Sequence, residues 1–319
     1  MPGEPDDDYR VVLDEGSLGW SHLTDAGLRD ILGTFLELLE GVADGRQAAF
    51  MDVAYETECW SQLTLFALAC TPHPAVPRDE RVRLAKLLDK CRVLEPQEED
   101  LPQAVRVSGG AHTEVSWGMS HALARAAVGR AMSCLVVPVV PGPSGWTTVD
   151  RDTDQVEIHI MSDPADATGF WREVYTRENI LEGQFFTLSG SAFPELIFER
   201  SLGFHRFKGS YAEVMPWLVQ LLGAINDHFA DALSEHAGDQ NQVIARFSAL
   251  GLNVSPESPS TKKNGKAWAQ RLVTYKDVPY RCEWHGKRLW SHDRVHFSLP
   301  IPEQGGRILI GLFVEHLGT

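Results

Sequence analysis

The sequence predicts a mixed α/β protein of two domains: an acidic α/β domain over residues 1–165 and an α+β domain over residues 166–319 that ends in an antiparallel sheet. In the first part, helical patterns lead into short apolar runs typical of buried parallel strands. In the second part, helical patterns come first, and strands of alternating polar and apolar residues follow. At 319 residues, the chain is long enough for each domain to bury a core of its own.

The N-terminal domain is expected to be a three-layer or open α/β unit, similar in outline to a Rossmann fold. A β-branched run ends in Asp14, and a stripe of leucines with helical spacing follows Thr24. Pro77 precedes acidic residues and starts another helix. The expected elements are strands over residues 9–14, 133–138 and 156–160, and helices over residues 24–39, from 77 onwards, and over 114–130.

The C-terminal domain is expected to carry two helices before its sheet. Apolar residues from Val214 to Phe229 keep helical spacing, which predicts a helix over 211–234, and a second helix is expected over 240–250. Residues 253–266 are rich in proline, serine and lysine, and this composition predicts a loop. Strands are expected over 280–285, 294–299 and 307–315, with a turn at Gly305-Gly306 between the last two.

Composition points to a cytoplasmic protein. The acidic first residues lack the apolar core of a signal peptide, and no stretch of the sequence is apolar enough to suggest a membrane span. The five cysteines are scattered and form no CxxC pair, so neither a disulfide framework nor a zinc ribbon is indicated. No metal or cofactor is expected.

Charge is unevenly distributed along the chain. Residues 255–319 hold ten bases and six acids, a net charge of +4, which leaves −19 for the other residues of a chain whose total is −15. A basic segment suits a polyanion such as RNA or the ribosome, and the acidic domain suits a protein partner or a sensing role. The residues expected to bind RNA are Arg281, Lys287, Arg288, Lys262, Lys263 and Lys266.

Candidate catalytic residues lie on the predicted sheet. Alternation places Arg281, Glu283 and His285 on one side of their strand, and Arg294 and His296 on one side of the next. Cleaving RNA without a metal requires a base for the 2′-hydroxyl, cations for the phosphorane and an acid for the leaving oxygen. The expected catalytic residues are Arg294, His296, His285, His316 and Glu283. We expect this polar face to be solvated, so that substitutions there change stability little.

The last strands resemble the C-terminal hairpin of RelE-type mRNA interferase toxins. The run Arg294-Val-His-Phe297, a glycine turn, and the apolar strand that ends at His316 are similar to that family's pattern. The resemblance covers roughly the last 60–110 residues and implies a small α/β fold that cleaves mRNA. It also implies that Arg294 contacts the scissile phosphate and that His316 is the terminal histidine.

The N-terminal domain resembles PIN-type ribonucleases more faintly. Those proteins begin with a strand that ends in aspartate, here Asp14, and carry acids near later helix starts, here Glu56 or Glu58 and Glu114. Clustered carboxylates would hold Mg²⁺ or Mn²⁺. The acid expected after the buried strand is missing, since Val136–Val140 is apolar, which favours a non-catalytic relative.

Two functions follow from the sequence. The first is a toxin-like or antiviral-defence effector, a hydrolase that acts as a metal-independent endoribonuclease through the C-terminal sheet. The alternative is a non-catalytic subunit that binds protein and RNA within a larger complex. The sequence specifies neither the substrate, nor an activating ligand, nor the oligomeric state.

Overall fold

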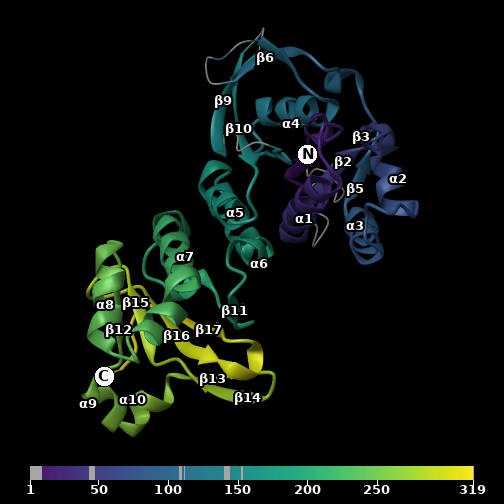
Figure 1. Cartoon of the computed structure of the whole chain (residues 1–319). Coiled ribbons are helices and arrows are strands. Elements are labelled where there is room, and N and C mark those ends of the chain that lie inside the picture. The colour runs from purple at the N-terminus through teal and green to yellow at the C-terminus, as the bar shows by residue number, and fades with distance from the viewer. Residues whose placement is uncertain are drawn as a thin grey trace. The chain divides into compact units, whose positions relative to one another are not determined.

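The computed structural model describes residues 9–42, 47–107, 110, 112–139, 144–151 and 154–318. The chain forms two compact units, Met1–Phe170 and Trp171–Thr319, and the division falls inside helix α5 (Asp166–Arg177). Both units combine helices with a sheet, so the chain is a mixed α/β protein (Figure 1). None of the helices in these ranges is both long and apolar enough to cross a bilayer.

The N-terminal unit contains an eight-stranded sheet in the order β5-β2-β1-β8-β10-β9-β6-β7. The first five strands in this order are parallel, and the last three extend the sheet in antiparallel fashion. The strands are β1 (Val11–Leu13), β2 (Ala48–Met51), β5 (Arg92–Leu94), β6 (Ala104–Val107), β7 (His112–Glu114), β8 (Ser133–Leu135), β9 (Gly145–Asp150) and β10 (Gln155–Met161). Because β1 and β8 are covered on both faces, all of their residues are buried.

The helices of this unit begin and end largely where the sequence predicts. Leucines 28, 32 and 39 are buried on one side of α1, and Pro77 caps α3 ahead of two acids. The helices are α1 (Asp25–Val42), α2 (Leu65–Cys70), α3 (Arg78–Lys90) and α4 (Trp117–Ala127). A short hairpin and three 3₁₀ turns complete the described part of the unit: β3 (Glu58–Trp60), β4 (Leu63–Thr64), η1 (Glu15–Leu18), η3 (Asp52–Glu56) and η4 (Glu98–Asp100).

The helix predicted over 114–130 starts later than expected. Glu114 ends the edge strand β7, and Ser116 caps α4 by accepting a hydrogen bond from the N–H of Met119. Glu114 therefore does not lie at a helix start, and its side chain is exposed.

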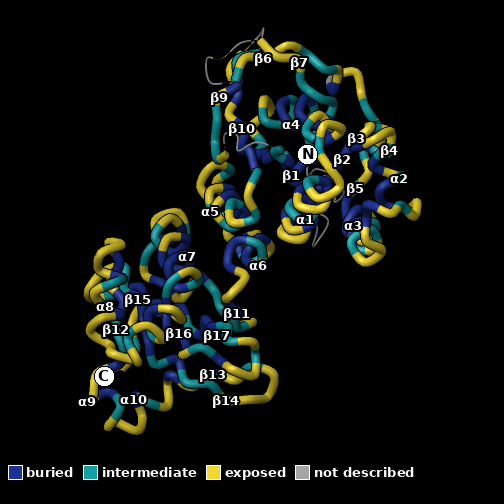
Figure 2. Tube along the Cα trace, in the orientation of Figure 1, coloured by how far each residue is buried: buried dark blue, intermediate teal, exposed yellow. Residues whose placement is uncertain are grey.

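The C-terminal unit contains a five-stranded sheet in the order β11-β17-β16-β15-β12. β11 is parallel to β17, and the other pairs are antiparallel. The strands are β11 (Leu196–Phe198), β12 (Asn253–Pro256), β15 (Trp284–Lys287), β16 (Arg294–Ile301) and β17 (Arg307–Val314). Most of β16 and β17 is buried (Figure 2).

The helix α7 (Tyr211–Glu235) packs on one face of this sheet. Phe229 meets Trp284 and Phe297 edge to face, with ring centroids 5.2 and 4.9 Å away. The other elements of the unit are α6 (Ser189–Ala192), α8 (Gln240–Ala249), α9 (Pro259–Lys263), α10 (Gly265–Ala269), the ribbon of β13 (Leu272–Tyr275) and β14 (Val278–Arg281), and the 3₁₀ turns η5 (Glu182–Thr187), η6 (Phe204–Arg206) and η7 (Pro302–Gln304).

Two predictions in this unit were wrong. The strand expected over 280–285 is two strands, since β14 ends at Arg281 and β15 starts at Trp284 in another sheet. The loop expected over 253–266 is instead β12, α9 and the start of α10, because Ser258 caps α9 and Pro259 occupies its first turn. The turn at Gly305 and Gly306 is confirmed, and both residues have positive φ angles of 73° and 82°.

Gly311 lies where β17 carries one extra residue relative to β16, between Ile310 and Leu312. A Cβ at this position would lie 2.3 Å from the Cys282 sulfur and 2.9 Å from Val273, and both side chains are buried. We therefore expect Gly311→Ala to lower the free energy of unfolding by about 1–3 kcal/mol through overpacking. Chemical denaturation measures this change, and Gly190→Ala in α6, where no atom lies within 4 Å, is the control. Equal stability of the two variants would contradict the close packing.

Candidate functional site

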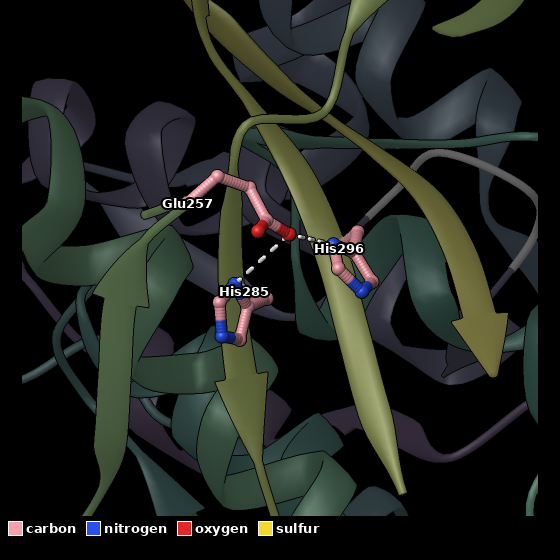
Figure 3. A group of neighbouring side chains, drawn as sticks. All are labelled: Glu257, His285 and His296. Atoms are coloured by element: carbon pink, nitrogen blue, oxygen red, sulfur yellow. Dashed lines mark ion pairs between the residues drawn. The ribbon is translucent and has the colours of Figure 1, made fainter. Parts of the chain in front are cut away.

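Three side chains converge beside the antiparallel sheet: Glu257, His285 and His296 (Figure 3). His285 on β15 pairs directly with His296 on β16, and their ring centroids are 5.1 Å apart. Oε1 of Glu257 lies 3.4 Å from Nδ1 of each imidazole. Because side chains alternate along a strand, both histidines lie on the face opposite to the one that packs on α7.

Glu257 owes its position to the end of β12. Its N–H donates to the carbonyl of Glu283, which extends the pairing of β12 with β15 by one residue. Ser258 then turns the chain into α9 by capping it. The carboxylate is thus held where the strand ends and the helix begins.

Arg271 completes the cluster from the residues that follow α10. Its Nε donates to Oε1 of Glu257 at 3.0 Å, and its Nη1 donates to the carbonyls of Ala267 and Gly318 at 2.7 and 2.8 Å. The Arg271 side chain is fully buried and that of Glu257 is 4% exposed. A buried ion pair needs additional hydrogen bonds of this kind to offset the loss of hydration.

Two further cations border the histidines. Arg294 is the register partner of Lys287, two residues along the strands from the imidazole pair. Arg294 is 9% exposed, and its Nη2 donates to the carbonyl of Trp290. His316 is exposed after the end of β17 and interacts electrostatically with Arg294, Arg271 and Glu257.

The charges of the cluster follow from burial. Burial tends to raise the pKa of Glu257, but contacts with His285 and Arg271 outweigh it and hold the pKa at about 2. Burial lowers the pKa of His285 and lowers that of His296 further, well below its usual range. Both shifts favour the uncharged form of the imidazoles. One carboxylate then faces the positive charges of Arg271, Arg294 and Lys287, which leaves a net positive site.

Several buried nitrogens of the site have no hydrogen-bond partner within the described ranges. They include Nη2 of Arg271, Nε of Arg294 and both ring nitrogens of His296. Leaving such groups unpaired is costly, and the two guanidinium N–H groups, which can only donate, favour a ligand that brings acceptor atoms. An anion such as a phosphate meets this requirement and the positive charge together.

The same three residues could also hold a metal ion. Ligand atoms of Glu257, His285 and His296 all lie within 4.8 Å of one another, and within the described ranges no other group of three or more such side chains gathers in this way. Two imidazoles and a carboxylate are a donor set that suits several divalent transition metals. The three neighbouring cations oppose this binding, because they repel a metal ion.

The remaining predicted residues lie outside the cluster. Glu283 pairs with Lys262 at 2.9 Å, and the Arg281 guanidinium lies 4.6 Å from the centre of the Trp268 ring. Arg288 pairs with the buried Asp293 and closes the β15–β16 turn. Lys263 and Lys266 are exposed on α9 and α10.

Burial corrects two expectations about the polar face. Arg281, Glu283 and His285 do not share one face, because the chain changes strand between Arg281 and Trp284. The face is not solvated, since His285 and His296 are 5% and 0% exposed. Alternation distinguishes the two faces of a strand but does not show what covers them.

The expected Asp14 and its neighbour Glu15, at the end of β1, accept backbone hydrogen bonds. Glu15 accepts the N–H groups of Trp117 and Gly118 at the start of α4, and Asp14 accepts that of Gly16. Burial raises the pKa of both carboxyls. Glu56 and Glu58 lie on η3 and β3.

Comparison of the chain with protein-family models, curated proteins and solved structures finds no match. The chemistry of the site must therefore be inferred from its own residues.

Replacing Glu257 should show how much the buried ion pair with Arg271 contributes to the stability of the fold. Glu257→Gln leaves Arg271 charged and buried beside two other cations, so we expect a loss of roughly 3–5 kcal/mol in the free energy of unfolding. The control is Glu283→Gln, whose ion pair with Lys262 is partly exposed and should contribute less than about 1 kcal/mol. Chemical denaturation compares the two variants. A small loss for Glu257→Gln would mean that the carboxylate does not organise the cluster.

The stability of the unit should depend on pH through His296. Its pKa is lowered in the folded chain, so the unfolded chain takes up a proton first as the pH falls below about 6.5. The free energy of unfolding should therefore decrease as the pH falls from about 7 to 5. His296→Gln should show a shallower decrease over this range in urea denaturation, and an unchanged slope would contradict the lowered pKa.

Proposed function

We propose that the C-terminal unit is an endoribonuclease that cleaves RNA without a metal, and that it acts as a toxin-like or defence effector. The observation that carries this proposal is the pair of buried imidazoles between a carboxylate and three cations. This combination provides both an anion site and a proton acceptor in one place. The similarity of the last two strands to the RelE-type hairpin agrees with it.

In this proposal the phosphodiester binds against Arg294 and Lys287. An imidazole of the His285–His296 pair takes the proton of the 2′-hydroxyl, and the 2′-oxygen attacks phosphorus. The bond from phosphorus to the 5′-oxygen breaks, and Lys287 donates a proton to that oxygen. Lys287 suits this role, since burial and the charge of Arg294 lower its pKa. The products are a 2′,3′-cyclic phosphate and a 5′-hydroxyl.

A metal-dependent phosphodiesterase is a second candidate, favoured by the spacing of Glu257, His285 and His296. The two candidates differ in one measurement. Cleavage that persists in EDTA supports acid–base catalysis, and cleavage lost in EDTA and restored by Zn²⁺ or Mn²⁺ supports the metal site.

For the N-terminal unit, we propose a Rossmann-like domain that senses a signal or binds a protein partner. Five parallel strands with β1 at the centre support the fold assignment. Asp14 and Glu15 lie at the end of β1, where PIN-type enzymes bind metal, but here they hold backbone N–H groups. This arrangement favours a non-catalytic role.

Arg294→Ala should reduce RNA cleavage by about 10²-fold or more, the scale for removing one preorganised donor to the developing phosphorane. The matched control is Arg307→Ala on the neighbouring strand, whose guanidinium donates to the carbonyl of Gln304 and lies outside the cluster. Cleavage of free and ribosome-bound RNA, with and without EDTA, gives the rates. If wild-type protein leaves both RNAs intact under every condition, catalysis is excluded and the interaction subunit takes its place.

A further inference from the structure

A surface pocket of about 370 Å³ in the C-terminal unit lies where β16 continues past the His285–His296 pair. Trp268, Tyr280, Arg281, Glu283 and Glu303 line it together with residues 298–302 of β16 and η7. Its volume falls in the lower part of the roughly 300–1,000 Å³ range of small-ligand pockets. None of the roles assigned above uses this space.

The pocket and the cluster share their supporting elements. Ser298 of the pocket follows His296 by two residues on β16, and Trp268 precedes Arg271 by three residues. The carbonyl of Glu283 accepts from the N–H of Glu257, and that of Trp268 accepts from Nη1 of Arg281. A polymer chain bound at the cluster can therefore place another of its groups in the pocket.

The lining of the pocket suits a flat, aromatic ligand. The indole of Trp268 and the phenol of Tyr280 offer aromatic surface, and the planar guanidinium of Arg281 lies over the Trp268 ring. Proteins bind unstacked bases of single-stranded RNA on aromatic rings and on arginine planes. The Glu303 carboxylate and Oε1 of Glu283, whose Oε2 accepts from Lys262, only accept hydrogen bonds, so they favour a base edge that donates.

We propose that this pocket binds a nucleobase of the single-stranded RNA whose phosphate the cluster holds, and that it prefers bases with an amino group over uracil. The proposal rests on the proposed function, because it assigns the neighbouring cluster to a phosphodiester. The substrate is therefore unpaired RNA. Trp268 is the main positioning residue.

The test measures binding of short, single-stranded 2′-O-methyl oligonucleotides, which cannot be cleaved because their 2′-hydroxyls are blocked. Trp268→Ala should weaken binding roughly tenfold, the scale of losing one base–aromatic stack, and Trp268→Phe should restore most of it. Binding should quench tryptophan fluorescence less in Trp268→Phe than in wild type. A cytosine oligonucleotide should bind roughly fivefold or more tightly than its uracil counterpart, because cytosine has the 4-amino group.

The control is Trp217→Ala, because Trp217 lies on α7 and contacts Phe207, away from the pocket. Melting temperatures of all variants exclude a loss of folding. Wild-type protein that binds RNA with no dependence on Trp268 overturns the base pocket, even if RNA is cleaved. Binding that depends on Trp268 without any cleavage of ordinary RNA supports the pocket and overturns the proposed catalysis. Equal binding of cytosine and uracil overturns the stated preference.

Discussion

The Oε1 atom of Glu257 is shared by three neighbours, and much of the C-terminal unit depends on this sharing. Arg271 donates to it, and His285 and His296 approach it from two strands. Moving a carboxylate out of water costs several kcal/mol, and only well-placed cations and donors offset that cost. The oxygen thereby fixes β12, β15, β16 and the residues after α10 relative to one another. Through Arg271 the same network reaches the carbonyl of Gly318.

The sequence predicted the elements whose pattern is long and regular. The apolar stripes of α1 and α7 and the strands β16 and β17 could be recognised, because their period follows from backbone geometry. It also brought His285, His296 and Arg294 together as candidates. Pairing two strands of alternating residues was enough for this, although the strand predicted over 280–285 was too long.

Glu257 and Arg271 could not be found in the same way. They are separated by two short helices, in a segment whose proline, serine and lysine content resembles a loop. The one local signal is Ser258-Pro259, which fits a helix cap followed by a first-turn proline. Burial of the polar face was also missed, because it depends on residues outside the two strands, such as Glu257. A strand pattern contains no information about such a cover.

The location of the charges helps to distinguish a catalytic site from a surface that only binds RNA. A surface that only docks on RNA needs accessible cations, and Lys263 and Lys266 meet that need on their own. Burying two arginines and two histidines around one carboxylate adds cost without adding accessible charge. Low-polarity surroundings strengthen electrostatic interactions with a bound ligand and shift proton affinities, which are properties that catalysis uses.

The turn between β15 and β16 has a role beyond connecting them. It runs from Arg288 to Asp293, is closed by their ion pair, and is anchored by hydrogen bonds from Lys208 and Gly209 to Asp293. Its length sets which residues of the two strands face each other. One inserted residue would turn one of the two histidines toward α7, and two would separate the imidazoles along the strands. The length of the turn thus sets the register of the two strands and the position of both histidines. Natural variation in this length should therefore be far more restricted than the exposed position of the turn suggests.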